Sequence, residues 1–307
     1  MIYYLDSIQY IMDSKKAHRE IGFIGLGIMG KPMVKNLLKS GYKVSFFARR
    51  KKVIDEISAI GGIYIKNISD LPKSCKVIIL NLPKSNDVHN IVLGERGLYK
   101  NILPDTTLID MSTISPDVTV EIADKLKVKK SYMIDAPVSG GEIGAINGNL
   151  SIMVGGQKKV FNKILPILSV LGENITYIGK SGSGQITKAC NQILVAGTLV
   201  AVSEVLLMAK KSGCNLNLVR EALMGGFANS KILEVHGNRM ISSDYKPGFK
   251  SKLHLKDLDI ALNIAKDLNI NLKGTKYSRK LMHQSVVDKK QEKDSSVIHE
   301  IIKKINK

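Results

Sequence analysis

The chain has 307 residues with 44% of them hydrophobic, and this length exceeds one average globular domain and predicts two. Its formal net charge of +19 invites a nucleic-acid partner, but the lysines are spread along the chain and form no single basic block. We therefore expect no nucleic-acid partner and interpret the charge as a diffuse, solvated surface that favours small anionic molecules, such as a phosphorylated cofactor and a carboxylate substrate.

Cysteine usage and the apolar runs indicate a cytoplasmic protein. Cys75, Cys190 and Cys214 form no C-x-x-C pair, which argues against disulfides and zinc, and no metal is expected. Residues 1–19 form an N-terminal extension whose mixed acidic and apolar sequence fits neither a secretory signal nor a transit peptide. The uncharged run 189–203 is short and interrupted by polar amides, so no membrane partner is expected.

Short apolar runs alternate with helical patterns over residues 20–182. This alternation predicts an α/β domain of the Rossmann type, with a doubly wound, mostly parallel sheet. After the glycine- and serine-rich link 179–184, helical periodicity dominates, so residues 183–307 are predicted as an all-α C-terminal domain. The strands are predicted at 21–24, 43–47, 77–80, 107–110, 132–135 and 150–156.

The turn Gly25-Leu26-Gly27-Ile28-Met29-Gly30 follows the first predicted strand and opens a predicted helix. In this context the first glycine allows a tight turn, the second lets the backbone approach a pyrophosphate, and the third lets helix and strand pack closely. The helix N-terminus then attracts the anion. The turn therefore predicts dinucleotide binding, with a purely structural turn as the alternative.

Arg49 and Arg50 stand where an NAD site usually has an acidic residue, at the end of the second predicted strand. A carboxylate there would repel a ribose 2′-phosphate, whereas two guanidinium groups can bind it. The alternative is a solvated basic turn. The pair predicts a preference for NADPH, with NADH as a possible second cofactor.

Ser139, Gly140 and Gly141 follow the strand predicted at 132–135, on the side of the sheet where ligands bind in such folds. A hydroxyl beside two bare backbone amides can form a concavity for an anion. As an isolated pattern, the segment is more often a tight turn. Its place after the strand favours a substrate carboxylate site.

Lys188 enters a long, almost uncharged stretch that we predict to be a helix buried nearly all round. Lys188, Asn191 and Gln192 fall at i, i+3 and i+4, so their polar groups share one face. A buried lysine costs free energy unless it is paired or used, and burial lowers its pKa from the free value of about 10.4. The residue therefore predicts acid–base chemistry.

Lys256 and Asp257 are ambiguous, since neighbouring charges on a helix are usually solvated, and Asp87, His89 and His283 are interpreted as surface residues.

Taken together, these residues resemble the β-hydroxyacid dehydrogenase family. Four separated motifs carry the resemblance, which covers the chain from Ile21 onward, and their combination is specific although each alone is not. In family order they are Gly22-Phe23-Ile24 with the glycine turn, Asp110-Met111-Ser112-Thr113, Asp135 to Gly141, and Gly184 to Gln192.

The resemblance implies roles for individual residues. It implies that Lys188 is the general acid, and that a long interdomain helix beginning near Gly184 joins the two domains of a homodimer or homotetramer. The residues implied to bind the substrate are Ser139, Gly140, Gly141, Asn191, Gln192 and Lys256. Those implied to bind the cofactor, besides the glycine turn, Arg49 and Arg50, are Leu82, Pro83, Thr113, Phe249 and Lys256.

Within the family, Lys188-Ala189-Cys190-Asn191-Gln192 and three further segments resemble the members that reduce tartronate semialdehyde (2-hydroxy-3-oxopropanoate) to D-glycerate with NADPH. The further segments are 224–228, 233–237 and 246–249. Oxidation of 3-hydroxyisobutyrate, or reduction of a related short-chain semialdehyde, is the first alternative. A non-catalytic, basic NADP-binding protein is a more remote one, and the pairing of Lys188 with Asn191 argues against it.

Overall fold

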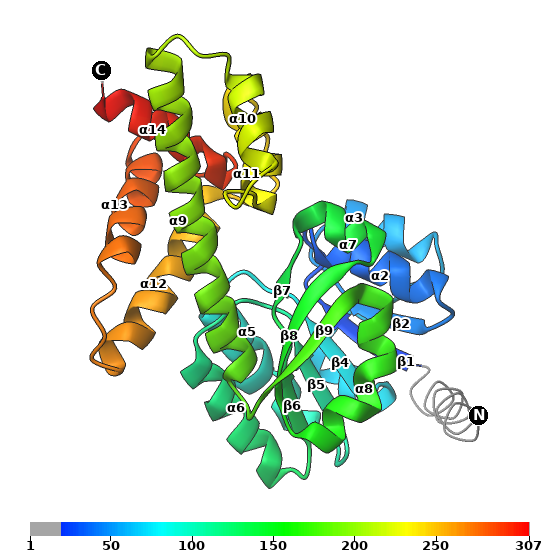
Figure 1. Cartoon of the computed structure of the whole chain (residues 1–307). Coiled ribbons are helices and arrows are strands. Elements are labelled where there is room, and N and C mark those ends of the chain that lie inside the picture. Colours follow the sequence, from blue (N-terminus) through cyan, green and yellow to red (C-terminus); the bar gives the residue numbers. More distant parts are fainter. Residues whose placement is uncertain (1–19, 307) are drawn as a thin grey trace, which may run out of the picture. The chain divides into compact units, whose positions relative to one another are not determined.

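The computed structural model describes residues 20–306 (Figure 1), so the predicted extension 1–19 lies outside the described residues. The chain divides into two compact units, with the boundary between Lys188 and Ala189. This boundary lies inside helix α9 (Ser183–Lys211), so the first turns of that helix belong to the first unit. The predicted boundary at 182/183 falls at the start of α9 and stays a prediction.

A nine-stranded sheet forms the centre of the first unit. Its order is β3-β2-β1-β4-β5-β6-β8-β7, with β9 also paired to β8, and the strands from β3 to β6 in this order run parallel. The prediction of a doubly wound, mostly parallel α/β sheet is confirmed. The strands are β1 (Glu20–Ile24), β2 (Lys43–Phe47), β3 (Ile63–Tyr64), β4 (Val77–Leu80), β5 (Thr107–Asp110), β6 (Tyr132–Asp135), β7 (Val138–Ser139), β8 (Leu150–Gly156) and β9 (Gly172–Gly179).

Helices cover both faces of this sheet, because its central strands bury side chains on both sides. In β4, Val77 and Ile79 face one core, whereas Ile78 and Leu80 face the other. The first core includes residues of α2, α3, α7 and α8, and the second includes residues of α5 and α6 (Figure 1). The helices are α2 (Gly30–Lys39), α3 (Lys51–Ser58), α4 (Leu71–Ser74), α5 (Ser85–Leu93), α6 (Pro116–Val128), α7 (Gly141–Asn147) and α8 (Lys158–Leu171), with short 3-10 helices at Ile68–Asp70 and Leu98–Asn101.

Three strands were not predicted from the sequence. β3 and β7 have two residues each, too few for a recognisable alternation. β9 alternates between half-buried and exposed side chains, and its glycines and polar residues weaken the strand pattern further. It is held by its parallel pairing with β8, a contact that the local sequence does not encode.

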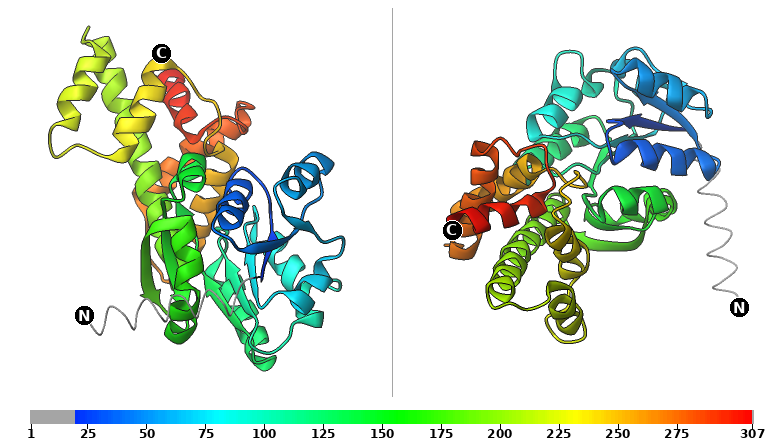
Figure 2. Two further views of the ribbon diagram at one scale, coloured as in Figure 1. Left: turned by 90° about the vertical axis from the view of Figure 1, so that its right-hand side faces the viewer. Right: turned by 90° about the horizontal axis from the view of Figure 1, so that it is seen from above.

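The second unit is built of helices, which confirms the predicted all-α C-terminal domain. The later turns of α9 share a hydrophobic core with α11 to α14, and Figure 2 shows these helices grouped around α9. The helices that follow α9 are α10 (Leu216–Met224), α11 (Lys231–Ser242), α12 (Ser251–Asp267), α13 (Lys273–Val287) and α14 (Ile298–Ile305), with a 3-10 helix at Ser295–Val297.

The prediction that α9 is buried nearly all round is wrong. Leu199 and Leu206 lie in the core of the second unit, but Leu194 is 71% exposed and Met208 is 67% exposed. One face of the helix packs against α11 to α14, while a mostly apolar face that includes Glu204 remains at the surface. By length and composition, the whole helix could cross a membrane, although its uncharged run alone is too short. Its inner face, however, packs against other helices, as the core helix of a folded domain does.

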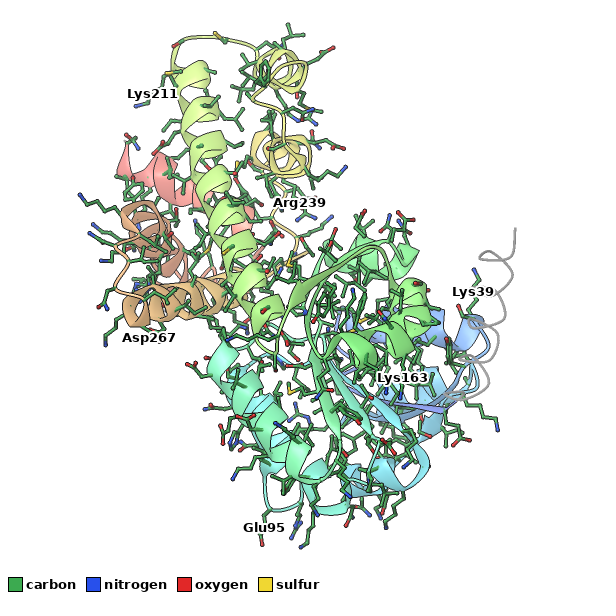
Figure 3. The ribbon with its side chains drawn as sticks, turned by 60° about the horizontal axis from the view of Figure 1, so that its bottom comes forward. Lys39, Glu95, Lys163, Lys211, Arg239 and Asp267 are labelled. Carbon is green, nitrogen blue, oxygen red and sulfur yellow. The ribbon has the colours of Figure 1, made fainter. Side chains whose placement is uncertain are left out.

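Charged side chains are distributed over many elements. Lys39 on α2, Lys163 on α8, Lys211 on α9 and Asp267 on α12 are all exposed, and Figure 3 shows each of them pointing away from its own helix. Acidic side chains interrupt the basic ones, for example where Glu56 on α3 pairs with two lysines of α2.

Candidate active site

The strand order reverses between β1 and β4, which creates a crevice at the carboxyl ends of these two strands. Open α/β sheets bind their ligands at such a switch point. The chain leaves β1 into the glycine turn and leaves β4 into Asn81, whose backbone N–H donates to the Ile24 carbonyl at 2.9 Å. The predicted dinucleotide motif therefore lies where this fold class places its cofactor.

The space around each glycine of the turn fits the role predicted for that glycine in dinucleotide binding. Gly25 has a φ of +105°, and a Cβ there would lie 2.2 Å from the Asn81 carbonyl oxygen. A Cβ on Gly30 would lie 2.0 Å from the Gly25 carbonyl oxygen, so α2 packs closely against the turn. At Gly27 a Cβ would meet no protein atom within 4 Å, which leaves the turn open toward solvent at the position where a pyrophosphate approaches.

Gly27→Ala is expected to weaken NADPH binding without loosening the fold. The added methyl group meets no protein atom but occupies cofactor space, and such overpacking costs about 1–3 kcal/mol, which corresponds to about 5–150-fold in Kd. Fluorescence titration with NADPH and thermal unfolding measure the two effects. Gly274→Ala, on α13, is the matched control, since a Cβ there also meets nothing within 4 Å. Unchanged NADPH affinity, or a lowered Tm, would contradict the assignment.

Arg50 lies directly beside the glycine turn. Its Nη2 donates to the Leu26 carbonyl oxygen at 3.3 Å, and both Arg49 and Arg50 are exposed at the end of β2. The first turn of α3 contains no acidic residue that would oppose a phosphate. The structure thus places the Arg50 guanidinium next to the glycine turn, with Arg49 preceding it in the chain, while their binding of a 2′-phosphate stays a prediction.

The segments predicted to line the nicotinamide are tied together at the ends of β4 and β5. The Leu82 backbone N–H donates to the Ser112 hydroxyl oxygen at 2.8 Å, and the Ser112 N–H donates to Asp110 Oδ1 at 3.0 Å. The turn Leu82-Pro83 and the half-buried Thr113 therefore belong to adjoining loops. The structure brings together these parts of the predicted cofactor site.

The predicted carboxylate turn contains two successive glycines with positive φ. Gly140 has a φ of +134° and Gly141 a φ of +63°, so both adopt conformations that other residues rarely tolerate. Ser139 ends β7, which pairs with β8, and α7 begins at Gly141. Successive backbone N–H groups in such a turn can point at one anion.

Lys188 is the last residue of the first unit and lies one turn into α9. It is only 7% exposed, so the predicted burial of this lysine is confirmed by the structure. The preceding helical turn is held at the end of β6, where Asp135 accepts hydrogen bonds from the backbone N–H groups of Gly182 and Gln185 at 2.9 and 3.1 Å. The lysine thus stands on a helix whose start is anchored to the sheet.

In the second unit, polar residues of α9 and α12 form a hydrogen-bonded chain. Gln192 Nε2 donates to Asp257 Oδ2 at 2.6 Å, and Asn191 Nδ2 donates to Gln192 Oε1 at 2.8 Å. The Lys256 ammonium lies 2.8 Å from Asp257 Oδ1. Three of the predicted substrate residues therefore share one network.

The structure resolves the ambiguity of Asp257, which is not a solvated charge: its side chain is 2% exposed and accepts from Gln192. The sequence contains a signal that would have found it. On α12 Asp257 stands at i+3 from His254 and at i−4 from Ala261, and all three are buried on the face that packs inward. His254 in turn contacts the Gln192 carbonyl through Nε2 at 3.2 Å.

Phe249, predicted to lie near the cofactor, precedes α12 in the second unit. Its ring centroid is 5.5 Å from that of His254, and its backbone N–H donates to Asp294 Oδ2 at 2.9 Å. By contrast, His89 stands 3.4 Å from Glu121 at the surface, and His283 is exposed. Within residues 20–306, no cluster of three His, Cys, Asp or Glu residues could hold a metal ion.

The doubly wound sheet has an open glycine turn at its switch point, and a helix with a buried lysine follows the sheet. Together with the family matches, these features identify an NAD- or NADP-dependent oxidoreductase. Residues 20–179 match the family model of the NAD binding domain of 6-phosphogluconate dehydrogenase. Residues 182–302 match the model described as NAD-binding of NADP-dependent 3-hydroxyisobutyrate dehydrogenase. The chain belongs to the β-hydroxyacid dehydrogenases related to 3-hydroxyisobutyrate dehydrogenase.

Relatives with named activities match nearly the whole chain. A 2-hydroxy-3-oxopropionate reductase of Escherichia coli (strain K12) is 43% identical, with 91% of this chain and 95% of the relative covered. A mitochondrial 3-hydroxyisobutyrate dehydrogenase of Drosophila melanogaster is 33% identical, with 95% and 92% covered. The solved structure of a Mycobacterium tuberculosis 3-hydroxyisobutyrate dehydrogenase with L-serine superimposes with a TM-score of 0.83 at 27% identity, covering 92% of this chain and 98% of that one.

Proposed function

We propose that the chain reduces tartronate semialdehyde to D-glycerate and that NADPH is its preferred hydride donor. The 43% identity with a 2-hydroxy-3-oxopropionate reductase supports the choice of substrate. The buried Lys188 is the observation that carries the chemistry, since a lysine that is only 7% exposed near the strand ends can supply a proton away from bulk water.

The reaction assigns each group of residues one task. When bound, the reduced nicotinamide supplies a hydride to the aldehyde carbon. Lys188 hydrogen-bonds to the aldehyde oxygen, stabilises the negative charge that develops there, and donates the proton that completes the hydroxyl group. Ser139 and the backbone amides of Gly140 and Gly141 hold the substrate carboxylate, and Asn191 and Gln192 orient the substrate.

An NADPH-oxidation assay with four aldehydes tests the proposal. Tartronate semialdehyde is expected to give the highest kcat/KM, by at least about 10-fold over methylmalonate semialdehyde, succinic semialdehyde and glyoxylate. Chiral analysis should identify the product as D-glycerate. A preference for methylmalonate semialdehyde would instead identify a 3-hydroxyisobutyrate dehydrogenase, and NADPH binding without oxidation by any aldehyde would identify a non-catalytic binding protein.

The double variant Arg49→Ala/Arg50→Ala is expected to abolish the preference for NADPH. Loss of charge-assisted hydrogen bonds to the 2′-phosphate, worth about 1.5–3 kcal/mol, should lower kcat/KM for NADPH by about 10–100-fold and leave that for NADH nearly unchanged. Lys52→Ala, which removes an exposed cation from the first turn of α3, the helix that begins directly after Arg50, is the control. Equal kcat/KM values for the two cofactors in the wild type would overturn the preference.

We also propose that the protein is a homo-oligomer, a dimer or tetramer. The exposed face of α9 in the second unit presents Leu194, Gly197, Ala201 and Met208 at helical spacing, with Glu204 as the one charged residue in this series, and a mostly apolar stripe favours burial against a partner. Leu194→Glu is expected to reduce the mass measured by light scattering to that of a monomer. Leu268→Glu is the control, since Leu268 is also exposed, at 62% against 71% for Leu194, but lies outside the stripe. A monomeric wild type would contradict the proposal.

A further inference from the structure

We infer that Gln185 is a positioning residue for proton transfer, because its buried amide fixes the turn of α9 that precedes Lys188 against the loop after β5. The inference rests on the proposed role of Lys188 as proton donor. Gln185 stands three residues before Lys188, so one helical turn connects the amide to the lysine. The amide itself touches neither substrate nor cofactor in this scheme and acts through the position of α9.

Both ends of the Gln185 side chain are used, although the residue is only 1% exposed. Its Oε1 accepts from the Ile114 backbone N–H at 3.1 Å, and its Nε2 donates to the Ser112 carbonyl oxygen at 2.9 Å. The loop that contains these two backbone groups also carries Thr113, one of the residues predicted to line the nicotinamide. An apolar side chain would leave these two buried backbone groups unpaired, which is unfavourable.

The backbone of the same helical turn is held at a second strand end. The N–H groups of Gly182 and Gln185 donate to the two carboxylate oxygens of Asp135, which is fully buried at the end of β6. Burial raises the pKa of Asp135, and these backbone hydrogen bonds oppose that effect. A Cβ on Gly184 would lie 2.4 Å from the Met153 carbonyl oxygen, so the helix start also packs tightly against β8.

The contacts of Gln185 continue to the neighbouring loop. Ser112, whose carbonyl accepts from Gln185, accepts from the Leu82 N–H through its hydroxyl group at 2.8 Å. The start of α9 is therefore linked through two hydrogen bonds to the loop after β4. Leu82 and Thr113 are predicted to line the nicotinamide. The network therefore fixes the position of the helical turn before Lys188 relative to the segments that would hold the hydride donor. A displacement of about 1 Å between reacting groups can cost about 10² in rate.

Gln185→Met tests the inference, since methionine retains the length of the side chain but neither hydrogen bond. We expect kcat per NADPH-binding site to fall by about 10²-fold, KM for NADPH to change by less than about 2-fold, and the solvent isotope effect on kcat to rise. Counting sites by NADPH titration removes any unfolded fraction from the comparison. Gln185→Asn, which is too short to reach both partners, should show the same pattern.

Thr187→Ala is the matched control, because the Thr187 hydroxyl donates only to the Ser183 carbonyl within α9, at 2.8 Å. It should retain wild-type kcat and isotope effect. A Gln185→Met enzyme with wild-type kcat per site, or with an unchanged isotope effect, would overturn the inference. Lys188→Ala in the same assay separates the positioning role of Gln185 from the proton-donor role of Lys188. If Lys188→Ala is inactive and Gln185→Met is normal, only the positioning role is refuted. If Lys188→Ala turns over, both roles are refuted.

Discussion

Lys188→Ala is expected to lower kcat for tartronate semialdehyde by about 10²–10⁴-fold while leaving the Kd for NADPH unchanged. This is the usual scale for the loss of a general acid, since the developing charge on the aldehyde oxygen loses its proton donor. Because Lys188 is only 7% exposed, bulk water can replace the ammonium group only poorly. Steady-state kinetics and equilibrium titration with NADPH measure the two quantities.

Two further variants distinguish proton donation from charge alone. Lys188→Arg keeps a positive charge, but guanidinium groups stay protonated at pKa values above about 12, so it should show a loss of similar size. Lys180→Ala removes an exposed lysine shortly before α9 and should leave kcat unchanged. Recovery of turnover by Lys188→Arg would indicate an electrostatic role, and near-normal turnover by Lys188→Ala would refute any catalytic one.

Asp294→Ala is expected to destabilise the protein by about 3–5 kcal/mol, the range for breaking a buried ion pair. The Asp294 side chain is 1% exposed and lies 3.2 Å from the Arg239 guanidinium and 3.3 Å from the His236 ring. Asp294 also accepts hydrogen bonds from two backbone N–H groups of the segment before α12 and from Ser296 in the 3-10 helix that begins directly after Asp294. These donors are Gly248 N, Phe249 N, Ser296 N and Ser296 Oγ. Urea unfolding measures the loss, and Asp267→Asn, at an exposed aspartate, is the control.

This carboxylate should also make stability depend on pH. Burial alone would raise the pKa of Asp294, but the adjacent His236 ring and the hydrogen bonds from the Phe249 backbone and Ser296 outweigh it and hold the pKa well below its usual range. A free aspartate titrates at about 3.9, so the stabilisation is complete above that value and is lost as pH falls toward the folded-state pKa. The stability difference between wild type and Asp294→Asn is expected to narrow below about pH 4. A difference that stays constant into acid would contradict this linkage.

The sequence predicts the fold class because the signals for it are local. The alternation of apolar strands and helices predicts the sheet, and the glycine turn places a dinucleotide at the end of β1. Lys188 stood out because a charged residue is unusual in an apolar helix. The exposed face of α9 was missed, since Leu194 and Met208 are as apolar as the core residues and periodicity cannot tell which face has a partner.

The residues that organise the candidate site were harder to find, because their roles depend on contacts between distant segments. Gln185 bonds to a loop 71 residues earlier, and Asp257 to Gln192 across 65 residues. In the local sequence Gln185 is an ordinary polar residue on a helix, and the spacing of Asp257 from His254 and Ala261 indicates its burial but not its partner. Asp294 likewise gains its significance only where it meets the segment 248–249, which is 45 residues away at Phe249.

Single-turnover reduction tests the central claim most directly, namely that Lys188 delivers the proton during hydride transfer to the semialdehyde. Enzyme in excess over NADPH is mixed rapidly with tartronate semialdehyde, and the nicotinamide absorbance is followed. We predict one fast decay with D-glycerate as the product for the wild type, and a decay slowed at least about 10²-fold for Lys188→Ala at equal NADPH occupancy. Decays of equal rate in the two proteins, or no decay in the wild type, would contradict the role of Lys188 as proton donor in semialdehyde reduction.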